Sequence, residues 1–135
     1  MPVAQDRVEE LQIKKLLHCV RTEDYSQIKK LCEKGVELLI NYNEPVDGET
    51  ALILAASMNN DRMLQYLLEL GAHPNVVDFK GRSALMRAAE LGHVQVMEML
   101  KKANADAKIK DIEGKGKRIA NIMMNDIIFN LSFVF

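Results

Sequence analysis

Residues whose side chains suit acid–base, nucleophilic or metal chemistry are few in this chain and lie far apart. The sequence has 3 His and 2 Cys, and none of them has a partner at the spacing of a metal-binding motif. His18, His73 and His93 have no nucleophile or oriented base nearby, so we expect no catalytic residue. We expect Cys19 and Cys32 to pack in the core, where cysteine behaves as a small apolar residue.

Motifs for calcium and phosphate are incomplete. The stretches 43–48 and 106–114 contain acidic residues and a glycine, but they lack the ligand spacing of an EF-hand loop. The stretch 114–117, Gly-Lys-Gly-Lys, lacks the spacing and the Ser or Thr of a phosphate-binding loop, and it is better explained as a turn glycine beside solvated lysines. We therefore predict a protein that is not an enzyme, with no metal, no cofactor and no small-molecule substrate.

The composition is typical of one helical domain. Its 135 residues are 48% hydrophobic and 27% charged, and Trp is absent, which favours helices packed through small and straight-chain apolar residues. Lys and Arg total 18 against 19 Asp and Glu, so no overall positive field attracts nucleic acid or an anionic membrane. Weak nucleic-acid binding is kept as an alternative, through the basic residues Lys80, Arg82, Arg87, Lys115, Lys117 and Arg118.

Targeting signals are not evident in the sequence. No apolar run follows Met1, and the partly apolar segment 119–135 is interrupted by Asn and Asp and is short for a membrane span of about 20 residues. We expect an intracellular, cytoplasmic protein that does not contact a membrane.

A repeat of 33 residues organises the chain. Gly48, Gly81 and Gly114 recur at this interval, and the residues around them match as well, with Thr-Ala-Leu at 50–52 aligned to Ser-Ala-Leu at 83–85. An earlier copy lies upstream at a spacing of 36, and we expect its three extra residues in the loop 41–45.

Each repeat has the residues that a turn and two helices require. The glycine at the start of each repeat is expected to supply the positive φ of a tight turn. The hydroxyls of Thr50 and Ser83 are suited to cap the first helix, and the Ala pairs that follow allow neighbouring helices to approach closely. The second helices carry apolar residues at positions i, i+1 and i+4, and we expect Gly35 and Gly71 to end two of them as left-handed C-caps.

The repeat resembles the ankyrin family in the runs 48–52, 67–75, 81–85 and 87–93. The resemblance implies an all-α solenoid of antiparallel helix pairs joined by β-turn loops, and it makes His93 a structural residue before a second helix. We expect an N-terminal segment at 1–10, a divergent N-terminal ankyrin-like cap at 11–45, repeats at 46–77 and 78–110, and a degenerate C-terminal repeat with an apolar tail at 111–135.

Within the family, residues 8–116 are similar to the N-terminal repeats of longer proteins that combine ankyrin repeats with EF-hand domains. The similarity is carried by the runs 8–13, 86–93 and 113–116. It implies that this chain is a truncated or alternatively terminated product of such a protein. An alternative role is then self-association through the apolar tail 117–135.

Members of the ankyrin family bind partner proteins with their turn tips and the exposed side of their first helices, on the concave face of the stack. Val46, Phe79 and Ile112 repeat an apolar residue at one turn-tip position, and the charge changes from acidic to basic along the row. We predict a protein-binding scaffold; in the alternative interpretation these residues only pack on neighbouring turns. The expected contact residues are Val46, Asp47, Glu49, Leu54, Met58, Phe79, Lys80, Arg82, Arg87, Leu91, Ile112 and Lys115.

Overall fold

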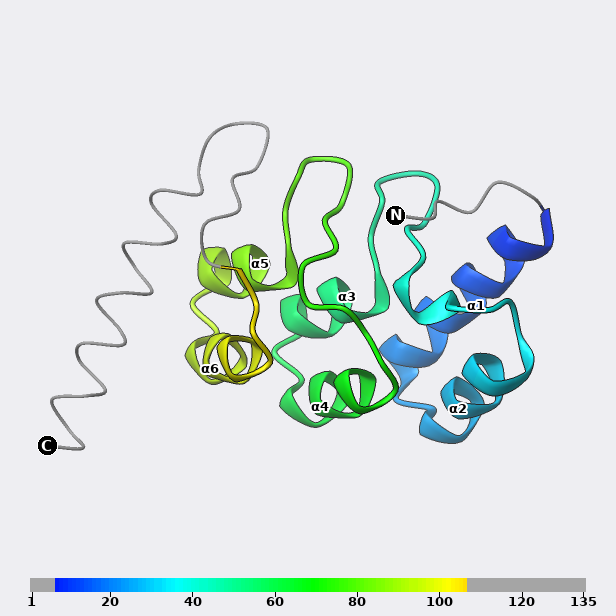
Figure 1. The fold of residues 1–135 in the computed structure, drawn as a ribbon, viewed down its shortest axis with the longest axis horizontal. Helices are drawn as coiled ribbons and strands as arrows, with labels where there is room; N and C mark the ends of the chain where they lie inside the picture. Colours follow the sequence, from blue (N-terminus) through cyan, green and yellow to red (C-terminus); the bar gives the residue numbers. More distant parts are fainter. Residues whose placement is uncertain (1–6, 107–135) are drawn as a thin grey trace, which may run out of the picture.

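The computed structural model describes residues 7–106, and these form a stack of three helix pairs (Figure 1). The expected C-terminal unit 111–135, with Gly114, lies outside the described residues. Within the described range the predicted all-α fold is confirmed, with no β-strand and with an isolated bridge between Val77 and Ser83. The helices are α1 (Arg7–Thr22), α2 (Tyr25–Lys34), α3 (Ala51–Ser57), α4 (Asp61–Glu69), α5 (Ala84–Leu91) and α6 (Val94–Lys102), with a short 3-10 helix η1 (Leu39–Asn41).

The helices lie in two layers. The first helices of the pairs, α1, α3 and α5, form one row, and the second helices, α2, α4 and α6, form the row below them in Figure 1. Two long loops, between η1 and α3 and between α4 and α5, extend from the opposite edge of the first row. Because α3 packs against both α1 and α5, it is the centre of the stack.

Alanine and leucine fill the core between these helices. Ala55 and Ala56 of α3 and Ala88 of α5 are completely buried, and their small side chains allow the two helices to pack directly. Leu64 and Leu67 of α4 are also completely buried. Each fully buried leucine contributes roughly 1.5–3 kcal/mol through removal of apolar surface from water. A single helix pair could not bury these faces alone, so the stack is the folding unit.

The predicted hydroxyl caps are confirmed. Thr50 Oγ1 accepts a hydrogen bond from the Ile53 amide at 3.2 Å, and Ser83 Oγ accepts one from the Met86 amide at 3.3 Å. Both caps are buried, so their hydrogen bonds satisfy amides that water does not reach. A cap of this kind contributes about 1 kcal/mol to helix stability.

The prediction for the glycines is correct at Gly48, Gly71 and Gly81, which have φ of 80, 98 and 76°. It is wrong at Gly35, which ends α2 with an extended backbone at φ −87° and ψ −160°. A Cβ atom at Gly35 would lie 2.6 Å from Gln12 Oε1, which accepts a hydrogen bond from the Val36 amide at 2.7 Å. The glycine therefore allows close contact with α1.

The three extra residues of the first unit are divided between two loops, which corrects the prediction that they lie together at 41–45. Asn41 Oδ1 accepts from the His73 amide and Asn75 Oδ1 accepts from the Asp106 amide, both at 2.7 Å, so Asn41 and Asn75 are equivalent. Asn41 lies ten positions after Leu31, whereas Asn75 lies only eight positions after the equivalent Leu67, so two extra residues precede Asn41. The third extends the following turn.

The outer layer is packed less closely between the first two pairs than between the last two. The backbone of α4 lies close to that of α6 over several residues, whereas it lies farther from the backbone of α2. Tyr25 of α2 and Tyr66 of α4 fill this joint as a T-shaped pair with ring centroids 5.1 Å apart, and the Arg62 guanidinium lies 5.0 Å from the Tyr25 ring centre. These side chains, with Gln65 and Glu69, line a hollow of about 420 Å³.

Replacement of Gly48 by alanine is expected to destabilise the fold more than replacement of Gly92. Both have positive φ, 80° and 73°, so alanine costs roughly 1–2 kcal/mol at either site. At Gly48 the new Cβ would also lie 2.6 Å from the Phe79 backbone nitrogen, whereas nothing lies within 4 Å at Gly92. Urea unfolding of the two variants measures the difference, and equal losses would contradict this explanation.

Candidate protein-binding surface

Two hairpin loops stand beside the first helices. In the first hairpin loop, residues 44–49, the Glu44 amide donates to the Glu49 carbonyl at 2.9 Å. In the second hairpin loop, residues 78–82, the Asp78 amide donates to the Arg82 carbonyl at the same distance. The first loop therefore has one more residue than the second, which accounts for the third extra residue of the first unit.

A carboxylate at the first position of each hairpin loop fixes its shape. The Glu44 carboxylate accepts hydrogen bonds from the amides of Val46 and Asp47. Asp78, only 6% exposed, accepts from the amides of Lys80 and Arg82, each at 2.9 Å. These bonds satisfy backbone amides that would otherwise bind water, and they restrict the conformation of each loop.

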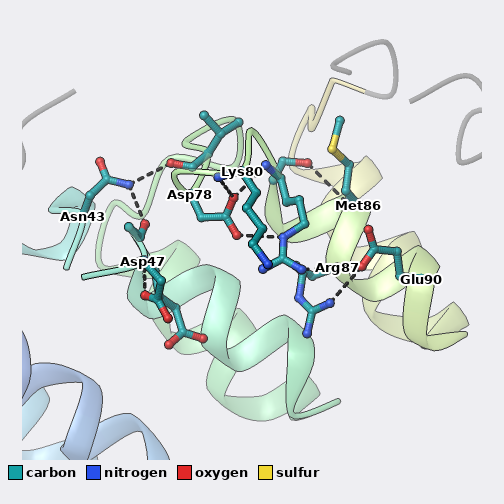
Figure 2. A network of polar contacts seen from close by, with 12 residues as sticks. Asn43, Asp47, Asp78, Lys80, Met86, Arg87 and Glu90 are labelled. Atoms are coloured by element: carbon teal, nitrogen blue, oxygen red, sulfur yellow. Dashed lines mark hydrogen bonds and ion pairs between the residues drawn. The ribbon is translucent and has the colours of Figure 1, made fainter. Parts of the chain in front are cut away.

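The two hairpin loops are joined into one edge (Figure 2). The side-chain amide of Asn43, only 3% exposed, donates to the carbonyls of Gly48 at 2.7 Å and Val77 at 2.8 Å. The Phe79 amide donates to the Asp47 carbonyl at 3.0 Å. The sequence does not mark Asn43 as a connecting residue, because asparagine is common in loops and nothing near it indicates contact with a second repeat.

The basic residues of the second hairpin loop and α5 are largely paired with acids. Arg82 Nε lies 2.9 Å from Asp78 Oδ2, and Arg87 Nη1 lies 2.8 Å from Glu90 Oε2. Arg82 Nη1 is also 4.0 Å from Glu90 Oε2, so Glu90 connects the two arginines. Figure 2 shows the pair of Arg87 with Glu90. Lys80 has no ion pair within residues 7–106. The expected basic end of the row is therefore close to neutral.

Glu49 is the acidic group that the fold perturbs most. Its carboxylate is 23% exposed and lies 3.6 Å from Arg21 Nη2 of α1. Burial raises its pKa, the neighbouring Asp47 and Glu44 raise it further, and Arg21 and Arg87 lower it, with a net increase above the ordinary value. Acidic residues thus gather in the first hairpin loop, whereas the basic residues of the second hairpin loop and α5 are partly balanced by Asp78 and Glu90.

The apolar residues Val46 and Phe79 occupy different positions in their loops. Phe79 directly follows the fixing carboxylate, whereas Val46 is the second residue after its own. The Phe79 ring lies against Gly48, where an added Cβ would be 2.5 Å from Phe79 Cδ1, and 47% of Phe79 is exposed. Val46 is 80% exposed. Phe79 therefore packs partly on the neighbouring turn, as the alternative interpretation expects.

The helix residues expected on the surface differ in how exposed they are. Met58 and Leu91 lie at the ends of α3 and α5 and are 38% and 45% exposed. Leu54 is only 7% exposed, so the expectation that it lies on the open surface is wrong. α3 is covered by α1 on one side and α5 on the other, which buries the middle of the helix. Ile112 and Lys115 lie outside the described residues.

Comparison with known proteins agrees with this arrangement. A family model described as ankyrin repeats in three copies matches residues 16–111. The chain belongs to the ankyrin-repeat family. Among solved structures it is similar to the ankyrin repeat domain of Bcl-3, described as a unique member of the IkappaB protein family. The two are 28% identical with a TM-score of 0.70 over 81% of this chain and 50% of the other, so this chain spans about half the length of that domain.

The histidines and cysteines differ in their burial and contacts. His93 Nδ1 lies 3.0 Å from the Ala56 carbonyl, so this side chain connects the start of α6 to α3, in agreement with its expected structural role. His18 and His73 are exposed. Cys19 is buried and Cys32 is half-buried, and burial raises the pKa of both thiols.

The described part of the chain offers no group of three His, Cys, Asp or Glu residues arranged to hold a metal ion. Between residues 7 and 106, no helix is both long and apolar enough to cross a membrane.

Replacement of Glu49 by glutamine is expected to stabilise the fold more at pH 7 than in acid. The folded-state pKa of Glu49 is raised, so its contribution to stability is present below the unfolded-state pKa and is lost as pH rises through the folded-state pKa. Glutamine cannot ionise and avoids this loss. Urea unfolding at pH 7 and at about pH 3.5, below the ordinary glutamate pKa, measures the effect. If the substitution stabilises the fold equally or more in acid than at pH 7, the ion pair with Arg21 outweighs burial in its effect on the Glu49 carboxylate.

Proposed function

We propose that this chain is a non-enzymatic scaffold or adaptor that binds a partner protein through its hairpin loops and the exposed ends of its first helices. Ankyrin repeat domains are generally protein–protein interaction modules and are typically non-catalytic. The observation that carries the proposal is the connection of the two hairpin loops through Asn43, which makes one continuous edge out of residues from two repeats.

A fixed edge of this kind favours binding because little conformational freedom remains to be lost. The Glu44 and Asp78 carboxylates hold their own loops, and the Phe79–Asp47 backbone bond holds the loops to one another. Ordering of a loop upon association costs about 0.5–1.5 kcal/mol for each immobilised side chain, and a surface that is already ordered avoids this cost. Val46 in the first hairpin loop, and Met58 and Leu91 at the ends of the first helices, add exposed apolar area.

The alternative of nucleic-acid binding is disfavoured by the same contacts. Arg82 and Arg87 are paired with Asp78 and Glu90, which leaves Lys80 as the unpaired cation of this set within residues 7–106. The other residues of the set, Lys115, Lys117 and Arg118, lie outside the described residues. Binding of a phosphate backbone requires several free cations on one face.

We propose further that the repeats are divided at 11–45, 46–77 and 78–110, and that the protein acts in the cytoplasm. The resemblance of residues 8–116 to repeats of ankyrin proteins with EF-hand domains supports a place in that subgroup.

A double variant, Val46→Asp with Leu91→Asp, is expected to lose the proteins that co-purify with the wild-type chain. Both side chains are exposed, so the charges disrupt apolar contacts without unfolding the stack, and circular dichroism checks this. The matched control is Ser26→Asp with Gln95→Asp, which adds the same charge to exposed positions of the outer helices. Affinity purification from native cells compares the two, and retention of all partners by the first variant would reject the proposed surface.

A further inference from the structure

The first helix of the stack is about twice as long as the other first helices. α1 has 16 residues, whereas α3 has 7 and α5 has 8. At the spacing of 36 between the first two units, Lys15 is equivalent to Ala51 at the start of α3, and the segment 8–13 is equivalent to the first hairpin loop, 44–49. The first unit therefore has a helix at the place where the two following units have hairpin loops.

This extension of α1 is held on one side by the segment that follows α2. Gln12 Oε1 accepts a hydrogen bond from the Val36 amide at 2.7 Å, and the Tyr42 hydroxyl donates to Glu9 Oε1 at 3.4 Å. Ile13 is completely buried. Because α1 ends the row of first helices, it has a neighbour in that row, α3, on one side only within the described residues (Figure 1). The opposite side of α1 faces solvent.

The exposed side chains of α1 form one stripe along the helix. They recur every three or four residues, which places them on a single face. The stripe consists of Arg7, Val8, Leu11, Lys14, Lys15, His18, Arg21 and Thr22. It contains no acid, because Glu9 and Glu10 are half-buried outside it. The outer helices α2, α4 and α6 differ, since their exposed positions include Glu33, Glu69 and Glu98 respectively.

The cations of this stripe are mostly without acidic partners. Arg7, Lys14 and Lys15 have no ion pair within residues 7–106. Arg21 lies 3.6 Å from Glu49, and its side chain is still 52% exposed. An incoming carboxylate therefore does not need to displace an acid from the stripe, in contrast to the paired arginines of the second hairpin loop and α5.

Apolar side chains within the stripe select among anionic partners. Val8 and Leu11 are one helical turn apart and are 58% and 59% exposed. A phosphate backbone supplies charge but no apolar group to cover them. Attachment to an anionic membrane scales with the apolar area that is buried, and two side chains provide little of it. A protein segment can supply carboxylates and apolar side chains together.

We propose that the exposed stripe of α1 binds an acidic segment of a partner protein. Carboxylates of this segment pair with Arg7, Lys14 and Lys15, and its apolar side chains cover Val8 and Leu11. The stripe goes beyond the surface of the proposed function, because it shares no residue with that surface. Association through opposite charges is fast and weakens as salt is added.

The test is a pair of parallel selections of random phage-displayed peptides, against the full chain and against Lys14→Gln with Lys15→Gln. The peptides have about 16 residues, which span the length of α1 even as a helix. Those enriched by the full chain alone are expected to have an excess of Asp and Glu and at least two apolar residues. Their Kd is expected to rise at least about threefold between about 50 and 300 mM NaCl, because salt screens exposed charges.

Point variants then separate the two contributions. Lys14→Gln with Lys15→Gln is expected to weaken binding at least about fivefold, and Val8→Ser with Leu11→Ser at least about threefold. The matched control is Lys29→Gln with Lys30→Gln, which removes two adjacent exposed cations from α2. It is expected to change the Kd less than about twofold. Circular dichroism checks each fold, and Lys14→Ala with Lys15→Ala replaces the glutamine pair if that variant unfolds, since alanine favours helices.

Three results would overturn this inference. They are equal losses in the α2 control, enriched peptides without an excess of acid, and no peptide enriched by the full chain alone. A single-stranded oligonucleotide, or vesicles of phosphatidylcholine and phosphatidylserine, would also overturn it by binding α1 more tightly than the peptides do. If every enriched peptide is lost on Val46→Asp with Leu91→Asp and none on the lysine variant, the α1 surface is rejected and the proposed function stands.

Discussion

The direct packing of α3 on α5 is the constraint on which the rest of the molecule depends. Completely buried alanines at this contact bring the helices together, and no larger residue would permit the same approach. At this separation the Asn43 amide reaches the Val77 carbonyl, and His93 reaches the Ala56 carbonyl. The polar connections between repeats are therefore consequences of apolar packing. The alanines allow the helices to approach, and the hydrogen bonds then fix how neighbouring repeats are aligned.

The same separation determines the character of the outer edge. Because neighbouring hairpin loops meet, Phe79 covers Gly48 and its amide finds the Asp47 carbonyl. Arg21 of the first unit comes within ion-pair distance of Glu49 of the next, and Arg82 pairs with Asp78 and Glu90 of its own unit, so these arginines are partly neutralised within the chain. A short chain thus presents a surface that is ordered before any partner arrives, in keeping with its ankyrin fold.

Features that follow from local residue types were predictable from the sequence, and features that depend on contacts between elements or on the path of a loop were not. The caps at Thr50 and Ser83 follow from local residue types and a 33-residue period. The burial of Leu54 depends on α1 and α5, which lie on either side of it. The extended backbone at Gly35 likewise depends on Gln12, a residue of another helix. For the binding surface, the period indicated which residues recur, but the pairing of Arg82 with Asp78 required the actual path of the second hairpin loop.

The joint between α2 and α4 differs chemically from the contact between α3 and α5. At this joint Tyr25 and Tyr66 meet edge to face beside the Arg62 guanidinium and border a hollow of about 420 Å³, whereas buried alanines fill the contact between α3 and α5. A larger side chain at Ala55 or Ala88 would therefore have to push two helices apart, whereas a smaller one at Tyr25 or Tyr66 would enlarge an existing hollow.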